Sequence, residues 1–330
     1  MTDATMDQGS TRRHWGGLIL GAMLLGVLIW RLPWAEALVT LREVRLAWWV
    51  PALVLGAFGV WFRALRLHLV LGVPRPLLCV WRAVALGYLA GLVLPAGGGE
   101  VVKIRTLMKA RDLDILHAGS AVTLDRLFDL LGLVLGLALL AGLQALPGPV
   151  GTLLGVLSVA LVTTGVFLVL LITQGQATFL RLSLALTRLT WLATKVQRMG
   201  TLVGEAEHLR GARTWLRLVL FQLFITAFEV VVACIALRVL PVTAPMPPWA
   251  GLQVLMFGSI GFALPLLPGA AGSLQVAYIL ALTPFGVPLP QALGFSLLGH
   301  LGHLLVVLGH GLPALLLPRL SSRSGTAGQL

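Results

Sequence analysis

Apolar stretches long enough to cross a bilayer recur along this chain and constrain its fold more than any other feature. Several of them approach or exceed the roughly 20 residues that a helix needs to span the hydrocarbon core. The chain has 330 residues, of which 58% are hydrophobic and only 11% are charged, whereas soluble domains carry about 25% charged residues. We therefore predict an all-α polytopic membrane protein that forms a single membrane domain over residues 1–330, without a sizeable soluble catalytic domain.

The positive charge of the chain points to a membrane environment. The formal net charge is +12, and in membrane proteins Lys and Arg concentrate in cytoplasmic loops and beside anionic headgroups. No nucleic-acid recognition motif accompanies the charge, so we expect membrane lipid as the partner and no nucleic acid. The chain shows no Ser–His–Asp spacing, phosphate-binding loop or CxxC pattern. An enzyme is therefore disfavoured, and no cofactor or metal is expected.

Basic residues set the predicted orientation of the spans. The stretch "GGLILGAMLLGVLIW" favours an uncleaved first helix, with a cleaved signal peptide as the alternative. Arg63, Arg66 and His68 mark the cytoplasmic end of the second span. The spans after the first helix are predicted at about 48–71, 115–143, 153–173, 215–240 and 292–317, with a basic interfacial segment at 174–213. Both termini are then cytoplasmic, in a bacterial-type inner membrane.

Two further apolar stretches are interrupted by Pro and Gly. The first covers about 77–95 and precedes four basic residues, namely Lys103, Arg105, Lys109 and Arg111. A full crossing would leave these four outside, against the positive-inside bias, so we predict a re-entrant hairpin. The second stretch lies within 251–282 and predicts a hairpin that enters from the other face. Eight full spans are the alternative, because Gly and Pro are common in membrane helices.

The order of these elements predicts an inverted repeat. A span, a hairpin and a span over residues 48–143 match the same series over residues 215–317 in the opposite orientation. Transporters use this plan to build a binding site near the middle of the membrane from broken helices. The fold prediction is therefore six transmembrane helices plus two oppositely oriented re-entrant hairpins, with the basic segment between the repeats.

The first break, "PAGGGEVVKIR", is a candidate substrate-binding site. A helix that begins at such a break presents free N–H groups and the positive end of its dipole, which suit an anionic group such as phosphate. Its glycines let a ligand approach the backbone closely. The candidate residues are Pro95, Gly97, Gly98, Gly99, Glu100, Lys103 and Arg105. Glu100 either caps the helix, which is the purely structural alternative, or pairs with an arginine.

The stretch "TLDRLFDLLGL" adds three charged candidates. Asp125 and Asp129 are four residues apart and share a helix face, with Arg126 beside them. Ionisable residues within a membrane helix face the bundle interior and mark a functional site by default. These three can satisfy one another, or Glu100 can pair with Arg126. A purely structural ion cluster is the alternative.

The second break, "LPLLPGAAGSLQ", is the uncharged counterpart of the first. Its candidate substrate-binding residues are Pro268, Gly269, Gly272 and Gln275, and a tight helix crossing through small residues is the structural alternative. Glu229 is a further candidate, because it is a lone acid within the span at 215–240. His300, His303 and His310 share one sector of the last span, where polar packing is favoured over metal binding.

The order and spacing of these motifs resemble the lysylphosphatidylglycerol synthase transmembrane, or flippase-like, family. The resemblance covers roughly residues 45–317 and depends on a Pro/Gly break with Gly-Glu, a basic residue soon after, and an acid–Arg–x–x–Asp helix. Late in the family comes Pro-Gly-x-x-Gly-x-x-Glu, which matches Pro268, Gly269 and Gly272 here. This chain departs at Lys103, Asp125 and Gln275, where the family usually has Arg, Glu and Glu.

The resemblance implies that this membrane domain handles lipid. Relatives are linked to the flipping of modified phospholipids and to polyprenyl-linked or hopanoid pathways, and the sequence shows no aminoacyl-transfer domain. We therefore expect a flippase that translocates an anionic or modified lipid across the inner membrane. Two rival hypotheses are a secondary transporter of a small anionic solute and a non-transporting partner of a membrane glycosyltransferase or other lipid-modifying enzyme. The uncharged Gln275 weighs against any mechanism that needs two symmetric carboxylates.

Overall fold

The computed structural model describes Arg42 and residues 45–72, 76–94, 97–111, 113–144, 211–241, 246–263 and 270–316. The predicted first helix, the predicted span at 153–173 and almost all of the basic segment lie outside these residues. Three candidate site residues, Pro95, Pro268 and Gly269, also lie outside them.

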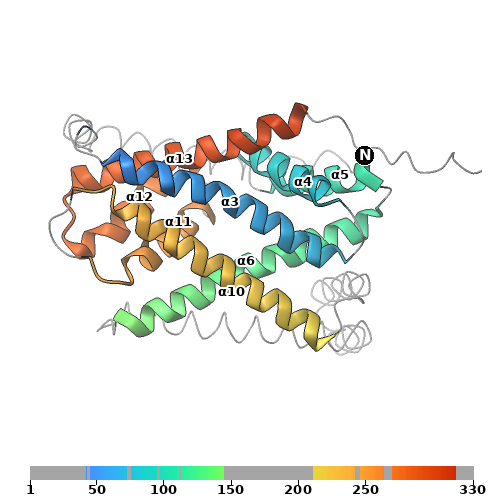
Figure 1. The fold of residues 1–330 in the computed structure, drawn as a ribbon, viewed down its shortest axis with the longest axis horizontal. Helices are drawn as coiled ribbons and strands as arrows, with labels where there is room; N and C mark the ends of the chain where they lie inside the picture. The colour runs from blue at the N-terminus through green and yellow to red at the C-terminus, as the bar shows by residue number, and fades with distance from the viewer. Residues whose placement is uncertain are drawn as a thin grey trace, which may run out of the picture. The chain divides into compact units, whose positions relative to one another are not determined.

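The described part of the chain is helical and contains no strand. Its elements are α3 (Leu46–Leu71), α4 (Leu77–Gly91), α5 (Gly98–Arg111), α6 (Ile115–Gln144), α10 (Ala212–Leu237), α11 (Ala250–Ala263), α12 (Ser273–Leu282), the 3-10 helix η3 (Thr283–Phe285) and α13 (Leu289–Leu316) (Figure 1). The all-helical prediction is therefore confirmed for these residues.

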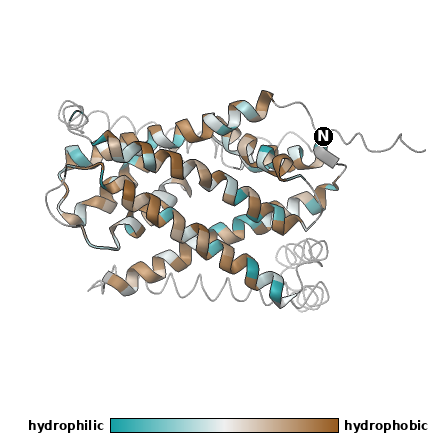
Figure 2. Ribbon diagram, in the orientation of Figure 1, coloured by the Kyte–Doolittle hydropathy of each residue, from teal (hydrophilic) through white to brown (hydrophobic). Residues whose placement is uncertain are grey.

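Four of these helices are long and apolar enough to cross a membrane. The segments are Leu46–Leu71, Ile115–Leu143, Arg213–Leu237 and Leu289–Leu316, and they coincide with four of the predicted spans. Hydrophobic residues occupy most of their length (Figure 2). Large apolar side chains such as Val54, Leu139 and Leu220 are more than half exposed, which suits contact with lipid tails. The total number of spans and the re-entrant hairpins stay predictions.

Both predicted breaks separate two helices, and each second helix begins after a glycine with positive φ. Gly97 has φ 88° before α5, and Gly272 has φ 83° before α12. Residues with a Cβ rarely adopt this conformation, so glycine is the residue that the chain needs at these two points. At the second break Ala270 also has positive φ, at 59°. The glycines of the two breaks thus start new helices, as their sequence indicates.

Contacts between residues divide the chain into two compact units. The charged unit comprises 60–87, 100–226 and 310–330, and the apolar unit comprises 1–59, 88–99 and 227–309. The boundary between them falls within α3, α4, α5, α10 and α13. The inverted repeat over 48–143 and 215–317 stays a prediction.

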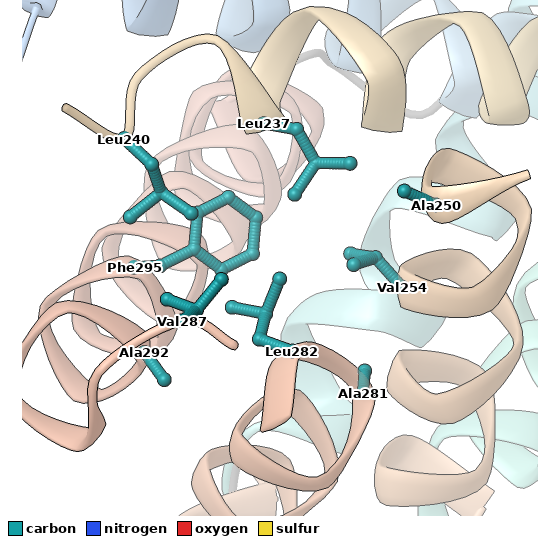
Figure 3. Close-up of a cluster of buried hydrophobic side chains, with 9 residues drawn as sticks. All are labelled: Leu237, Leu240, Ala250, Val254, Ala281, Leu282, Val287, Ala292 and Phe295. Carbon is teal, nitrogen blue, oxygen red and sulfur yellow. The ribbon is translucent and has the colours of Figure 1, made fainter. Parts of the chain in front are cut away.

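The apolar unit is centred on a cluster of close-packed side chains from four helices (Figure 3). It consists of Leu237, Leu240, Ala250, Val254, Ala281, Leu282, Val287, Ala292 and Phe295. Helices in a membrane associate through van der Waals contact, so small residues at their crossings matter more than apolar area. Gly251 illustrates this, because a Cβ there would overlap the Cys234 sulfur. The buried Gln253 donates from Nε2 to the Ala281 carbonyl at 2.8 Å, which satisfies its amide within the apolar surroundings.

Backbone groups at helix ends in the charged unit are satisfied by side chains. Asp114 precedes α6, and its Oδ1 accepts from the Ile115 N–H at 2.8 Å, which is an N-cap contact. His117 Nε2 lies 2.9 Å from the carbonyl oxygen of Leu71 at the last residue of α3. Arg82 Nε of α4 donates to the Ala314 carbonyl of α13 at 2.9 Å. The first two contacts hold the ends of α3 and α6, which carry residues of the candidate site.

Candidate functional site

A ring of six ionised side chains lies in the charged unit and joins three helices. Its members are Arg66 from α3, Glu100 and Lys103 from α5, and Asp125, Arg126 and Asp129 from α6. Five of the six were predicted from the sequence as site residues, and Arg66 was not.

Arg66 is the centre of the buried half of this ring. Its side chain is 0% exposed, and Nε donates to Asp125 Oδ1 at 2.8 Å while Nη2 donates to Asp129 Oδ1 at 2.7 Å. Nη2 also donates to the Asp125 backbone carbonyl at 3.1 Å, and Nη1 donates to the amide oxygen of Gln222 from α10. Because all three nitrogens donate to protein acceptors, Arg66 fixes two carboxylates and is not available to bind a ligand.

The remaining contacts close the ring. Lys103 Nζ lies 3.8 Å from Asp125 Oδ2 and 3.2 Å from Glu100 Oε2. Glu100 Oε1 pairs with Arg126 Nη2, and Arg126 Nη1 lies 3.4 Å from Asp129 Oδ2. Every carboxylate oxygen of the ring therefore faces one ring cation, and positive and negative charges alternate around it. An ionised group within apolar helices costs several kcal/mol unless it is paired in this way.

Exposure divides the ring into a buried half and an accessible half. The side chains of Arg66, Lys103 and Asp125 are 0%, 3% and 4% exposed. In contrast, Glu100 is 22% exposed, Asp129 is 21% exposed and Arg126 is 48% exposed. Arg126 is therefore the ring cation that a ligand reaches most easily. The half-buried Arg63 also approaches this side, with Nη1 3.7 Å from Asp129 Oδ1.

Close packing of α6 against α10 brings Gln222 to the ring. Gly132 of α6 faces this glutamine, and a Cβ at Gly132 would overlap the Gln222 amide. Gln222 Nε2 also donates to Thr226 Oγ1 at 3.2 Å, which fixes the orientation of the amide with its oxygen toward Arg66. The small residue in α6 thus permits the contact that completes the coordination of Arg66.

The other candidates of the first break differ in whether they contact the ring. Glu100 is in the first turn of α5 and pairs with Arg126, which was one of the predicted alternatives. The side chain of Arg105 is exposed and makes none of the ring contacts. Gly97 supplies the positive φ before the helix, and Gly98 and Gly99 follow it. Glu229 is half-buried on α10 within the apolar unit, so it does not belong to the ring.

Arg66 and Gln222 were not predicted from the sequence as site residues. Arg66 served only to mark the cytoplasmic end of a span, yet its side chain is among the most buried in the described residues. An arginine inside an apolar helix that continues for five more residues satisfies the same default rule that selected Asp125. Gln222 carries no comparable signal, because its role depends on the packing of α6 against α10.

The second break forms a neutral hydrogen-bonded site in the apolar unit. Gln275 Oε1 accepts from the Gly272 N–H at 2.7 Å, so Gln275 caps its own helix. Its Nε2 lies 3.0 Å from His300 Nδ1 on α13. Ser273 Oγ donates to the Gly261 carbonyl at 2.9 Å, which joins α12 to α11. The predicted residues Gly272 and Gln275 are thus brought together, and His300 joins them.

The three histidines of α13 have separate surroundings. His300 contacts Gln275, and the His303 ring lies 4.4 Å from that of Phe262. His310 belongs to the charged unit, where its Nδ1 accepts from Trp81 Nε1 at 3.0 Å. No group of three or more His, Cys, Asp or Glu side chains is placed to hold a metal ion in the part of the chain that the structure describes. The contact of His310 is thus a hydrogen bond to an indole, and that of His303 is a ring contact.

A known family matches most of the chain. The family model described as lysylphosphatidylglycerol synthase TM region matches residues 14–311. No curated protein and no solved structure is significantly similar to the chain. The matched region contains every residue of the ring and both breaks, so the resemblance predicted from the sequence motifs is confirmed.

Proposed function

Because the chain belongs to the lysylphosphatidylglycerol synthase TM region family, and is thus a multi-pass membrane protein, we propose that it translocates a lipid with an anionic headgroup. The proposed location is the inner membrane with both termini in the cytoplasm, as the distribution of basic residues favours. The observation that carries this proposal is the ring of alternating charges, in which Arg126 is the most exposed cation.

Arg126 is suited to exchange its protein partners for a lipid phosphate. A guanidinium binds phosphate through charge-assisted hydrogen bonds, often two in parallel. When Arg126 turns to a ligand, Glu100 keeps Lys103 at 3.2 Å and Asp129 keeps Arg66 at 2.7 Å. Neither carboxylate is then left without a cation. The ring therefore opens at Arg126 at a lower cost than at any buried member.

The break before α5 supports the same role. Glu100 stands in the first turn of a helix, where free N–H groups and the positive dipole end favour an anion. A phosphate that replaces Glu100 as the partner of Arg126 would lie next to that helix start. In the proposed cycle, the two hairpins open the lipid path to opposite faces of the membrane in turn. Transport of this kind needs no catalytic residue.

A flipping assay tests the proposal. The purified protein is reconstituted into liposomes that contain phosphatidylglycerol with a fluorescent label on its headgroup, and dithionite reports the label that reaches the outer leaflet. We expect Arg126→Ala to slow labelled-lipid movement by roughly 10- to 100-fold, which corresponds to the loss of a hydrogen bond to a charged group. Arg217→Ala removes an exposed arginine of α10 and serves as the matched control with unchanged movement.

Mass spectrometry of lipids retained by the purified protein gives the substrate. We expect an anionic lipid to be enriched over the bulk membrane in the unmodified protein and in Arg217→Ala, and to be lost in Arg126→Ala. Equal flipping by Arg126→Ala and the unmodified protein, with both folded, would overturn the assignment of this site. Retention of bulk lipid alone would favour a small anionic solute as the transported species.

A further inference from the structure

Residues at equivalent positions of the two breaks make equivalent contacts, although their side chains differ in chemistry. Glu100 is the third residue of α5 and Gln275 is the third residue of α12, and each lies three residues after its positive-φ glycine. Glu100 reaches a side chain 26 positions later, and Gln275 reaches a side chain 25 positions later. Those partners, Arg126 and His300, lie equally far from the first residues of their helices, Ile115 of α6 and Leu289 of α13.

The next turn of each helix repeats the correspondence. Three residues after Glu100, Lys103 contacts Asp125, the residue before Arg126. Three residues after Gln275, Tyr278 packs against Gly299, the residue before His300, where a Cβ would lie 3.0 Å from the tyrosine ring. Each contact lies within a single unit. His300 therefore occupies at the second break the position that Arg126 occupies at the first.

Hydrogen-bond chemistry fixes the protonation of His300. The Gly272 N–H is a donor only, so the Gln275 atom that faces it at 2.7 Å must be the amide oxygen. The amide nitrogen then faces His300 Nδ1 at 3.0 Å, and an amide NH₂ can only donate. Nδ1 must therefore accept, which places the proton of a neutral imidazole on Nε2. This nitrogen makes no hydrogen bond to the described residues, and the His300 side chain is partly exposed.

We propose that His300 is the ligand-binding donor of the second break, with Gln275 as the positioning residue that holds its proton on Nε2. The inference rests on the proposed function and names a second station for the same lipid. The acceptor is an oxygen of the headgroup region, such as a phosphate, ester or hydroxyl oxygen. A neutral donor binds such an oxygen about half as strongly as a charged one. The lipid is therefore held firmly at Arg126 and more weakly at His300, which favours its release.

Nuclear magnetic resonance of the imidazole nitrogens tests the positioning role directly. The protein is labelled with ¹⁵N-histidine, and the His300 signals are assigned by their loss in His300→Gln. We expect a neutral ring with the proton on Nε2. In Gln275→Glu the carboxylate accepts from His300, so the proton moves to Nδ1 or both nitrogens become protonated. A proton on Nδ1 in the unmodified protein would overturn the inference, and so would a tautomer unchanged by Gln275→Glu.

The flipping assay with labelled phosphatidylglycerol tests the binding role. His300→Leu removes the donor, and we expect a fall in the rate of roughly 2- to 10-fold, as for one neutral hydrogen bond. His300→Gln keeps an N–H donor and should restore most of the rate, which also shows that the site tolerates substitution. Equal rates for His300→Leu and the unmodified protein, alongside a slow Arg126→Ala, would reject the second station and leave the first intact. A normal rate in Arg126→Ala would instead reject the proposed function, while the imidazole spectrum still reports on Gln275.

Discussion

The two breaks of this chain use the same backbone device to support different chemistry. At both, a glycine with φ near 85° starts a helix whose third residue reaches a side chain on the next helix, with values of 88° at Gly97 and 83° at Gly272. In the charged unit that third residue is Glu100, and its partners are Lys103 and Arg126. In the apolar unit it is Gln275, which caps its own helix and contacts His300.

The difference shows how much one side chain changes the requirements of a site within a membrane. A carboxylate at this position needs cations, and those cations need further carboxylates, which the ring supplies. An amide at this position is satisfied by one backbone N–H and one imidazole. The charged break therefore recruits α3, α5 and α6 into its ring, whereas Gln275 at the neutral break contacts only its own helix α12 and α13 among the described residues. A mutation that removes a ring member should have wider effects than any at the neutral break.

The largest effect is expected for Arg66→Ala. The variant leaves Asp125 and Asp129 without their closest cation, and breaking a buried ion pair costs about 3–5 kcal/mol. We expect a loss of stability of that size in mixed micelles, measured by circular dichroism during titration with SDS. His300→Leu, at the neutral break, should lose about 1 kcal/mol. Similar losses in the two variants would contradict the difference drawn between the breaks.

Matched glycine substitutions test the shared backbone device and come next in size. Gly97→Ala and Gly272→Ala each force a Cβ into a left-handed conformation, so each should cost about 1–2 kcal/mol in the same titration. At Gly97 a Cβ would meet no atom within 4 Å, so its cost comes from the backbone alone. Gly59→Ala, which is helical and also meets nothing, should instead stabilise by about 0.5–1 kcal/mol. A neutral result at both breaks would remove the basis for calling them equivalent.

The four long helices, the two breaks and five of the six ring residues could be predicted from the sequence because they depend on local patterns. Apolar length predicted the helices, and the Pro/Gly clusters predicted the breaks and with them Glu100 and Lys103. Charge within an apolar helix selected Asp125, Arg126 and Asp129. Two kinds of contact could not be predicted. Arg66 was ambiguous, since an arginine near the end of a span either reaches the interface or turns inward. Which of the two occurs depends on whether carboxylates such as Asp125 and Asp129 lie within reach. The pairing of Gln275 with His300 depends on how α12 packs against α13, and the sequence around either residue does not indicate this packing.

Gln275→Leu is expected to have a smaller effect than the glycine variants. It removes the hydrogen bond to the Gly272 N–H and the contact with His300, and a typical neutral hydrogen bond contributes about 0.5–1.5 kcal/mol net. We expect a loss near 1 kcal/mol, because the exposed side of His300 can turn to water or lipid. Glu100→Leu should lose more, since it leaves Lys103 and Arg126 short of a carboxylate. The reverse order of the two losses in the SDS titration would contradict the ring as the more demanding site.

The smallest change in stability, and the sharpest comparison, is expected for Gln275→Glu. The new carboxylate still accepts from the Gly272 N–H, and an acid in the first turn gains about 0.3–1 kcal/mol from the helix dipole. That gain offsets the cost of a charge in apolar surroundings only if His300 takes up a proton and pairs with the carboxylate. The variant then gives the second break an acid–cation pair like that of the first. With His300 protonated, both breaks bind the headgroup through a cation, and the difference in binding strength between them disappears.

Stability should then change by less than about 1 kcal/mol. Labelled-lipid movement should slow, because the second break no longer releases the headgroup easily. Unchanged movement together with a protonated His300 would show that the charge difference between the breaks does not control release.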